Sequence, residues 1–195
     1  MLSDLMRGTI RRATVVAAAL AFGACGGDGD PVGVGPGNGG GDEGSFSATV
    51  SGDITASFNG TAFHGEATDS GSGDQAWILA LNTDDPNSGN SVLVFRLAGR
   101  PGTGTYDLKD LVSSGGLEDG EWGAIVTVGQ GGGLVFGAFS VSGTVTISSS
   151  SESRVQGTFS IQVTAVDPSN PQQQLSATVT GTFDARNGFV VFPGF

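Results

Sequence analysis

Histidine and cysteine, the side chains that most often act as a general base or a thiol nucleophile, are scarce in this chain of 195 residues. It contains one histidine, His64, and one cysteine, Cys25. A serine-hydrolase triad would have to use His64 as its base, and the G-x-S-x-G turn of many hydrolases is absent. A zinc site would need its other ligands from carboxylates alone, which is atypical. The sequence therefore predicts a protein that is not an enzyme, with His64 in a structural or solvent-facing position.

The segment AFHGEA holds the one pair of a base and an acid that a strand would place side by side. His64 and Glu66 are two residues apart, so alternation puts them on one face, opposite Phe63. Such a pair is a weak indication of catalysis. The more ordinary interpretation is an exposed pair on a strand, and that is what we expect.

Two acidic segments offer oxygen ligands for a hard cation. They are NTDDPNSGN, with Asp84, Asp85 and Asn87, and GLEDGEW, with Glu118, Asp119 and Glu121. Calcium takes about six to eight such ligands from flexible loops, so calcium is the only cofactor that the sequence suggests. Because Asp and Asn also favour β-turns, solvated turns are the alternative interpretation.

The two tryptophans are candidates for stacking on a sugar ring. Trp77 begins the nearly continuous apolar segment WILALN, which predicts a strand buried on both faces and therefore a core position. Trp122 directly follows the second acidic segment and is the better candidate for an exposed aromatic side chain. Together with Glu118, Asp119 and Glu121 it would form a carbohydrate-binding or carbohydrate-hydrolysing module.

The elements that must position these residues read as β-strands from Ser45 onward. Apolar and polar residues alternate most clearly over 138–147, 157–166 and 175–185, which predicts antiparallel strands with one buried face. In the first of these segments the expected inward residues are Phe139, Val141, Val145 and Ile147. Further strands are predicted at 46–50, 53–58, 61–67, 75–82, 91–98, 122–128, 133–137 and 188–192. Only DLKDLV, at 107–112, suggests a helical turn.

Turn signals separate these strands. Asn59-Gly60 lies between two β-rich arms and predicts a hairpin, while 82–90 and 167–174 read as polar loops with prolines. About eight to eleven strands in a domain covering 45–195 predict an all-β fold, an antiparallel β-sandwich or flattened barrel. Its apolar inner faces are sufficient for one core without disulfides.

The net charge of −11 limits the partners of this chain. An acidic surface gains nothing from approaching a phosphate backbone, which excludes nucleic acid as a partner. It equally disfavours direct electrostatic attachment to anionic lipid head groups.

Residues 1–24 have the pattern of a secretory signal peptide. Arg7, Arg11 and Arg12 precede an apolar run from Ala13 to Phe22, and the small residues Gly23 and Ala24 follow. The run is too short to span a bilayer comfortably. We therefore expect export from the cytoplasm by the general secretory route.

The sequence FGAC at 22–25 resembles the lipobox of bacterial lipoproteins. The resemblance implies cleavage between Ala24 and Cys25 and acyl chains on Cys25, which would anchor the chain to a membrane at the periplasmic face or the cell surface. A thioether-linked Cys25 also explains a lone cysteine in an oxidising envelope, for which a free thiol or an intermolecular disulfide is the alternative. The Gly-rich residues 26–44 read as a flexible tether. Without residues 1–24, five basic and eighteen acidic residues remain, a net charge of −13.

Three stretches resemble a DUF6252-like domain, a domain of unknown function in secreted lipoproteins of Bacteroidetes-type bacteria. They are FSATVSGDITASFNGTAFHGEA, LAGRPGTGTYDL and GTVTISSSSESRVQGTFSIQVTAV with the later VTGTFDA. The resemblance implies an exported all-β domain and brings no catalytic residues. The expected function is that of a lipid-anchored envelope protein with a binding or structural role, whose partner is a glycan or an envelope protein; a calcium-stabilised, adhesin-like domain is the alternative.

Overall fold

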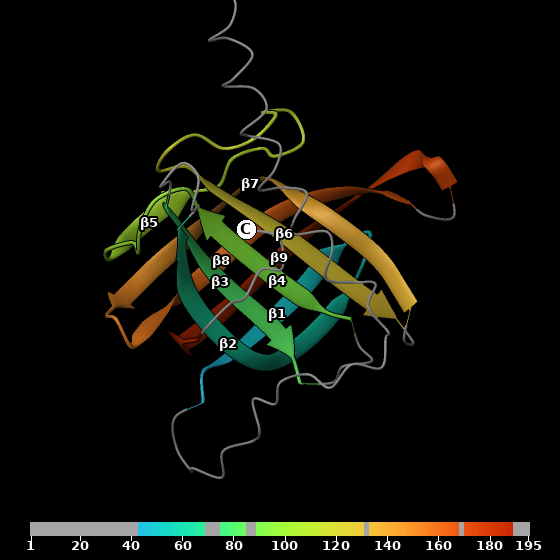
Figure 1. Cartoon of the computed structure of the whole chain (residues 1–195). Helices are drawn as coiled ribbons and strands as arrows, with labels where there is room; N and C mark the ends of the chain where they lie inside the picture. Colours follow the sequence, from blue (N-terminus) through green and yellow to red (C-terminus); the bar gives the residue numbers. More distant parts are fainter. Residues whose placement is uncertain (1–42, 69–74, 85–88, 131–132, 168–169, 189–195) are drawn as a thin grey trace, which may run out of the picture.

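The computed structural model describes residues 43–68, 75–84, 89–130, 133–167 and 170–188 (Figure 1). These residues form nine strands and no helix, which confirms the all-β prediction. The signal peptide, Cys25 and the tether up to residue 42 lie outside the described residues, as do 189–192 of the last predicted strand. The strands are β1 (Ser45–Gly52), β2 (Ala56–Thr68), β3 (Gln75–Thr83), β4 (Ser91–Arg96), β5 (Gly104–Asp107), β6 (Trp122–Gln130), β7 (Gly133–Ser150), β8 (Arg154–Asp167) and β9 (Asn170–Asn187).

The strands form one sheet that closes into a ring. Their order is β5-β7-β6-β4-β3-β2-β1-β9-β8, and a further pairing of β7 with β8 closes the ring, while β5 pairs only with β7. All neighbours in this order pair antiparallel, and one short parallel pairing joins β2 to β9. Figure 1 shows β3 and β4 in front of β8 and β9. The closed sheet is consistent with the antiparallel β-sandwich or flattened barrel that the alternating pattern predicts.

The predicted hairpin at Asn59-Gly60 is wrong, because β2 runs through both residues without a turn. Asn59 pairs with Ser47 and Gly60 with Phe46 in one continuous ladder. A Cβ on Gly60 would overlap the carbonyl oxygen of Asn82 on β3. The glycine is therefore needed for the close approach of a neighbouring strand and not for a turn.

Strand β7 merges two predicted strands and changes its inward face midway. Its pairing with β8 shifts register between Ser140 and Ser142, so Val141 is the extra residue of a β-bulge. Before the bulge Ala138 and Ser140 are buried inside, and after it Val145 and Ile147 are. The expectation of Phe139 and Val141 as inward residues is therefore wrong.

The bulge opens a gap between β6 and β7 that the chain after β5 fills. Leu108 bridges Trp122 in parallel, and Leu111 donates its backbone N–H to the carbonyl of Ser140. The buried Ser140 hydroxyl accepts a bond from the backbone N–H of Ala124 at 3.1 Å and donates to the carbonyl of Lys109 at 2.9 Å. The segment 107–112 therefore begins as an extended bridge, and the predicted turn starts later, at Asp110, whose carbonyl accepts a bond from the backbone N–H of Ser114. Strand β5 itself was not predicted.

The core lies inside the ring, and a smaller apolar cluster lies outside it. On β3, residues 77–81 are all buried, which confirms the prediction of a strand covered on both faces. Trp77, Leu79 and Leu81 face the interior. Ile78 faces outward onto the loop that precedes β6, through Leu117. None of the described residues belongs to a helix able to cross a membrane.

Candidate functional site

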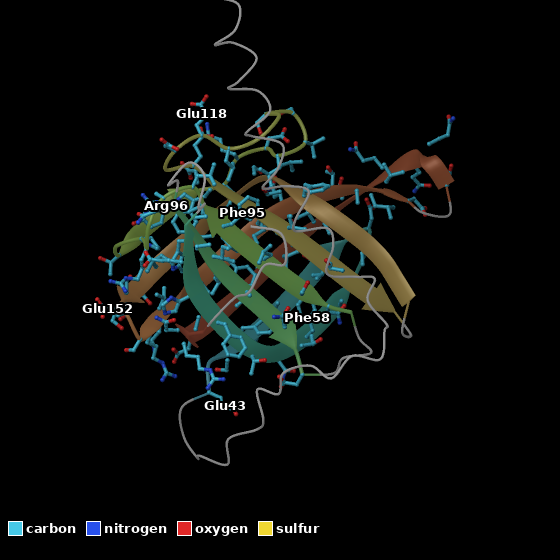
Figure 2. All side chains as sticks on the ribbon, viewed as in Figure 1. Glu43, Phe58, Phe95, Arg96, Glu118 and Glu152 are labelled. Carbon is cyan, nitrogen blue, oxygen red and sulfur yellow. The ribbon has the colours of Figure 1, made fainter. Side chains whose placement is uncertain are left out.

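One end of the ring carries a row of large polar and aromatic side chains on neighbouring strands. Glu66 on β2 pairs with Trp77 on β3, and Trp77 pairs with Arg96 on β4. Arg96 in turn pairs with Trp122 on β6. Because directly opposite residues of a sheet share a face, all four side chains stand on the inner face, at the same level. Figure 2 shows Arg96 at the left end of the ring and Phe58 toward the opposite end.

Three residues of this row, Trp77, Arg96 and Trp122, form a group with His64 and Tyr106 that we call the end cluster. The imidazole of His64 lies 6.2 Å from the Trp77 ring, and the two indole rings meet edge to face at 5.6 Å. Tyr106 from β5 stacks on Trp122 at 4.7 Å, and the Arg96 guanidinium lies 5.9 Å from the same indole. Five strand segments therefore place one connected set of rings and one cation inside the ring end.

The segment between β4 and β5, Leu97–Thr103, crosses this end of the ring and is called the capping segment. Its carbonyl at Gly99 accepts a bond from Nη1 of Arg96 at 2.7 Å, and its backbone N–H at Arg100 donates to Oε1 of Glu66 at 2.5 Å. The hydroxyls of Tyr106 and Ser150 donate to two further carbonyls of the segment, at 3.0 and 2.6 Å. Hydrogen bonds from four strands therefore hold the capping segment over the end cluster.

Four buried nitrogen atoms of the end cluster have no hydrogen-bond partner among the described residues. They are Nε2 of His64, Nε1 of Trp77, Nε of Arg96 and Nε1 of Trp122. The side chains of His64, Trp77 and Trp122 are at most 2% exposed, so water outside the domain does not reach them. A buried polar group without a partner costs about 1–3 kcal/mol, and native folds contain few of them. The described residues show no such atom elsewhere.

His64 is held in its neutral form by its surroundings. Burial lowers the pKa of the imidazole below its ordinary value of 6.5, and the positive charge of Arg100 lowers it further. The negative charge of Glu66 and a hydrogen bond to the backbone of Ser153 act in the opposite direction. The uncharged imidazole is therefore the form that the folded protein stabilises.

We expect the folded protein to lose stability as the pH falls below about 6.5, where histidines of the unfolded chain begin to take up protons. The folded imidazole has the lower pKa, so the unfolded state binds the proton first and the free energy of unfolding decreases until the folded pKa is reached. Chemical denaturation at several pH values measures this decrease, and His64→Gln removes the part due to the imidazole. Because His64 is the only histidine, its NMR titration curve is unambiguous; a midpoint at or above 6.5 would contradict the assignment.

The placement of His64 and Glu66 corrects the expected exposed pair. The two side chains do share a face opposite Phe63, but His64 is buried and only Glu66 is exposed. Strand β2 continues into the end of the ring that the capping segment covers, so its inward-facing side chains stay buried as far as His64. Trp77 is buried in the core, as predicted.

The prediction of an exposed Trp122 is wrong. Trp122 lies two and four residues before the buried Ala124 and Val126 of β6, so its side chain is on the same inward face of the strand. The indole therefore enters the ring although it follows an acidic loop. Glu118 and Asp119 stay exposed outside, and Glu121 pairs with Lys109 at 2.7 Å. The structure therefore separates Trp122 from the acidic side chains with which a sugar-stacking surface was predicted.

The candidate calcium ligands are only partly described. Asp84 accepts a hydrogen bond from the hydroxyl of Thr61 at 3.2 Å, whereas Asp85 and Asn87 lie outside the described residues. Within the described ranges no group of three or more His, Cys, Asp or Glu side chains is arranged to hold a metal ion. Calcium binding at Asp84, Asp85 and Asn87 stays a prediction.

Sequence reasoning missed Arg96 and Tyr106. The signal for Arg96 was present, because Val92 and Val94 alternate with it and place its side chain on the buried face of β4. A guanidinium at an inward position is rare enough to mark a site. Tyr106 had no such signal, because β5 is only four residues long.

Compared with models of known protein families, with curated proteins and with solved structures, the chain matches none. The DUF6252-like assignment stays a prediction.

Proposed function

We propose that this chain is a lipid-anchored protein of the bacterial cell envelope, with a β-domain that binds a partner or ligand and catalyses no reaction. The observation that carries the anchor is the position of the only cysteine, in FGAC, directly after an arginine-led apolar run. A single acyl chain binds membranes only marginally, whereas several chains on one residue anchor a protein stably. The acyl chains on Cys25 make the membrane the first partner of the protein.

The binding role is supported by the end cluster. Its unpartnered donors suit recognition of an acceptor group. A Gly-rich tether over 26–44, as the sequence predicts, would have an r.m.s. reach of about 25 Å, which would hold the domain just clear of the bilayer. A ligand or an envelope partner would then reach the ring end without hindrance from the lipid surface.

The variant Cys25→Ser tests the anchor. In cells producing the wild type we expect the protein in the membrane fraction, released by detergent and not by high salt, because acyl chains and not charges hold it. In cells producing Cys25→Ser we expect it to leave the membrane fraction. Immunoblots of the fractions measure both, and the high-salt wash is the control for electrostatic attachment. A serine variant that still sediments with membranes and resists salt would refute the anchor.

A further inference from the structure

Three of the four unpartnered atoms of the end cluster share one chemical character. The Nε1 atoms of the two indoles and Nε of Arg96 carry hydrogens at every accessible pH, so all three are donors. His64 differs, because its neutral imidazole bonds to the backbone of Ser153, which places the hydrogen on Nδ1 and leaves Nε2 an acceptor. The described part of the chain supplies no acceptor to the three donors. A group with several acceptor lone pairs would satisfy them.

Arg96 has no ion-pair partner among the described residues. Its Nη1 donates to the carbonyl of Gly99. Glu66 lies two strands away at the same level, where its carboxylate accepts the backbone N–H of Arg100. Two other cations of the described chain do form ion pairs, since Arg154 pairs with Asp184 and Lys109 with Glu121. A partly buried guanidinium without a counter-ion favours an anion.

The distribution of basic residues adds a second, longer-range argument. All five basic residues of the described chain lie at this end of the ring, although the chain is strongly acidic. Arg154 pairs with Arg186 across β8 and β9, and Lys109 follows the bridge to Trp122. Arg100 belongs to the capping segment. Asp184 and Glu121, the partners of Arg154 and Lys109, lie at the same end with Glu66, so the cations moderate its potential and do not make the whole end positive. Glu152 also lies at this end (Figure 2).

We propose that the end cluster binds the carboxylate group of a small organic acid beneath the capping segment, an inference that rests on the proposed binding role of the domain. The planar Nε edge of Arg96 suits the two oxygens of a carboxylate, and the indole N–H groups of Trp77 and Trp122 add donors from two further strands. One guanidinium balances the single charge of a carboxylate. A phosphate would bring a second negative charge into the same partly buried place, at the level of the Glu66 carboxylate. The aromatic rings of the cluster offer apolar surface to the body of the acid.

Intrinsic fluorescence reports on this site alone, because the chain contains two tryptophans and both belong to the end cluster. The full-length protein, purified in detergent from a whole-cell lysate, is titrated with benzoate, benzyl alcohol and inorganic phosphate. We expect a saturable fluorescence change with benzoate and none with the other two probes. In the same titration the imidazole NMR signal of His64 should shift with the same apparent affinity.

Two variants of equal charge locate the binding group. Arg96→Gln should weaken benzoate binding about tenfold or more, since hydrogen bonds to charged groups contribute that much. Arg186→Gln is the matched control, because its guanidinium stacks on Phe63 at 4.8 Å outside the cluster; its affinity should stay within about twofold of the wild type.

Several results would overturn the proposal. They are the absence of a saturable change with benzoate in the wild type, binding of benzyl alcohol or phosphate with equal affinity, and equal losses in Arg96→Gln and Arg186→Gln. If Arg96→Gln does not fold, the wild-type benzoate titration followed by fluorescence and by the His64 signal still decides. These measurements do not depend on Cys25, so their failure is distinguishable from failure of the membrane anchor.

Discussion

Replacing Gly143 by alanine is expected to destabilise the domain by about 3 kcal/mol or more. Gly143 lies in β7 with φ at +136°, a backbone conformation that residues with a Cβ rarely adopt. A Cβ there would also overlap the carbonyl oxygen of Ser160 and lie 2.9 Å from the Cα of Ile161 on β8. Both obstacles are backbone, so relief requires separating β7 from β8, the pair that closes the ring. Chemical denaturation followed by circular dichroism measures the loss.

Gly137→Ala is the matched control for this prediction. Gly137 lies in the same strand, has no positive φ and would place its Cβ in open space. Alanine should leave the stability unchanged or raise it by up to about 1 kcal/mol, because it restricts the unfolded chain. Equal losses in the two variants would show that β7 tolerates no side chain for some other reason and would refute the account of ring closure.

Replacing Trp77 by alanine is expected to cost about 3–5 kcal/mol of stability. The indole is fully buried and contacts His64 on one side and Trp122 on the other. Its removal leaves a cavity at the ring end and removes the support of both neighbouring rings. The free energy of unfolding, measured in denaturant, gives the cost directly.

Trp77→Phe separates the packing of the indole from its unpartnered N–H group. Phenylalanine keeps most of the buried ring and removes the donor that has no acceptor within the described chain. The cost of the smaller ring is therefore offset by the relief of a buried polar group, and the loss should stay below about 1.5 kcal/mol. A loss as large as that of Trp77→Ala would show that the N–H group is already satisfied in the free protein.

The fold could be predicted from the sequence where alternation is undisturbed. Strands β8 and β9 follow the predicted inward positions, such as Phe159 and Val179, because each has one wet and one buried face. Prediction failed where the backbone geometry depends on a distant strand. Asn59-Gly60 has the composition of a turn, but its glycine is needed for the close approach of β3. The apolar alternation in β7 continues unbroken through Val141, yet the bulge there exchanges the inward and outward faces of the strand.

The candidate site was harder to predict than the fold, because ring closure creates it. His64 and Trp77 attracted attention by their residue types, but nothing local indicated that four strands would bring them beside Arg96 and Tyr106. Trp122 was predicted at the surface because its neighbours are acidic. Its position in the alternation of β6 places it on the buried face instead. Residue type therefore singled out some residues of the end cluster, but only the closed sheet shows that they lie together.

The membrane anchor is tested most directly by the mass of the N-terminal peptide of the protein extracted from membranes. The account predicts a peptide that begins at Cys25, with the residues before it removed and the added mass of a diacylglyceryl group on the sulfur. A peptide that retains residues 1–24, with an unmodified thiol at Cys25, would contradict the account.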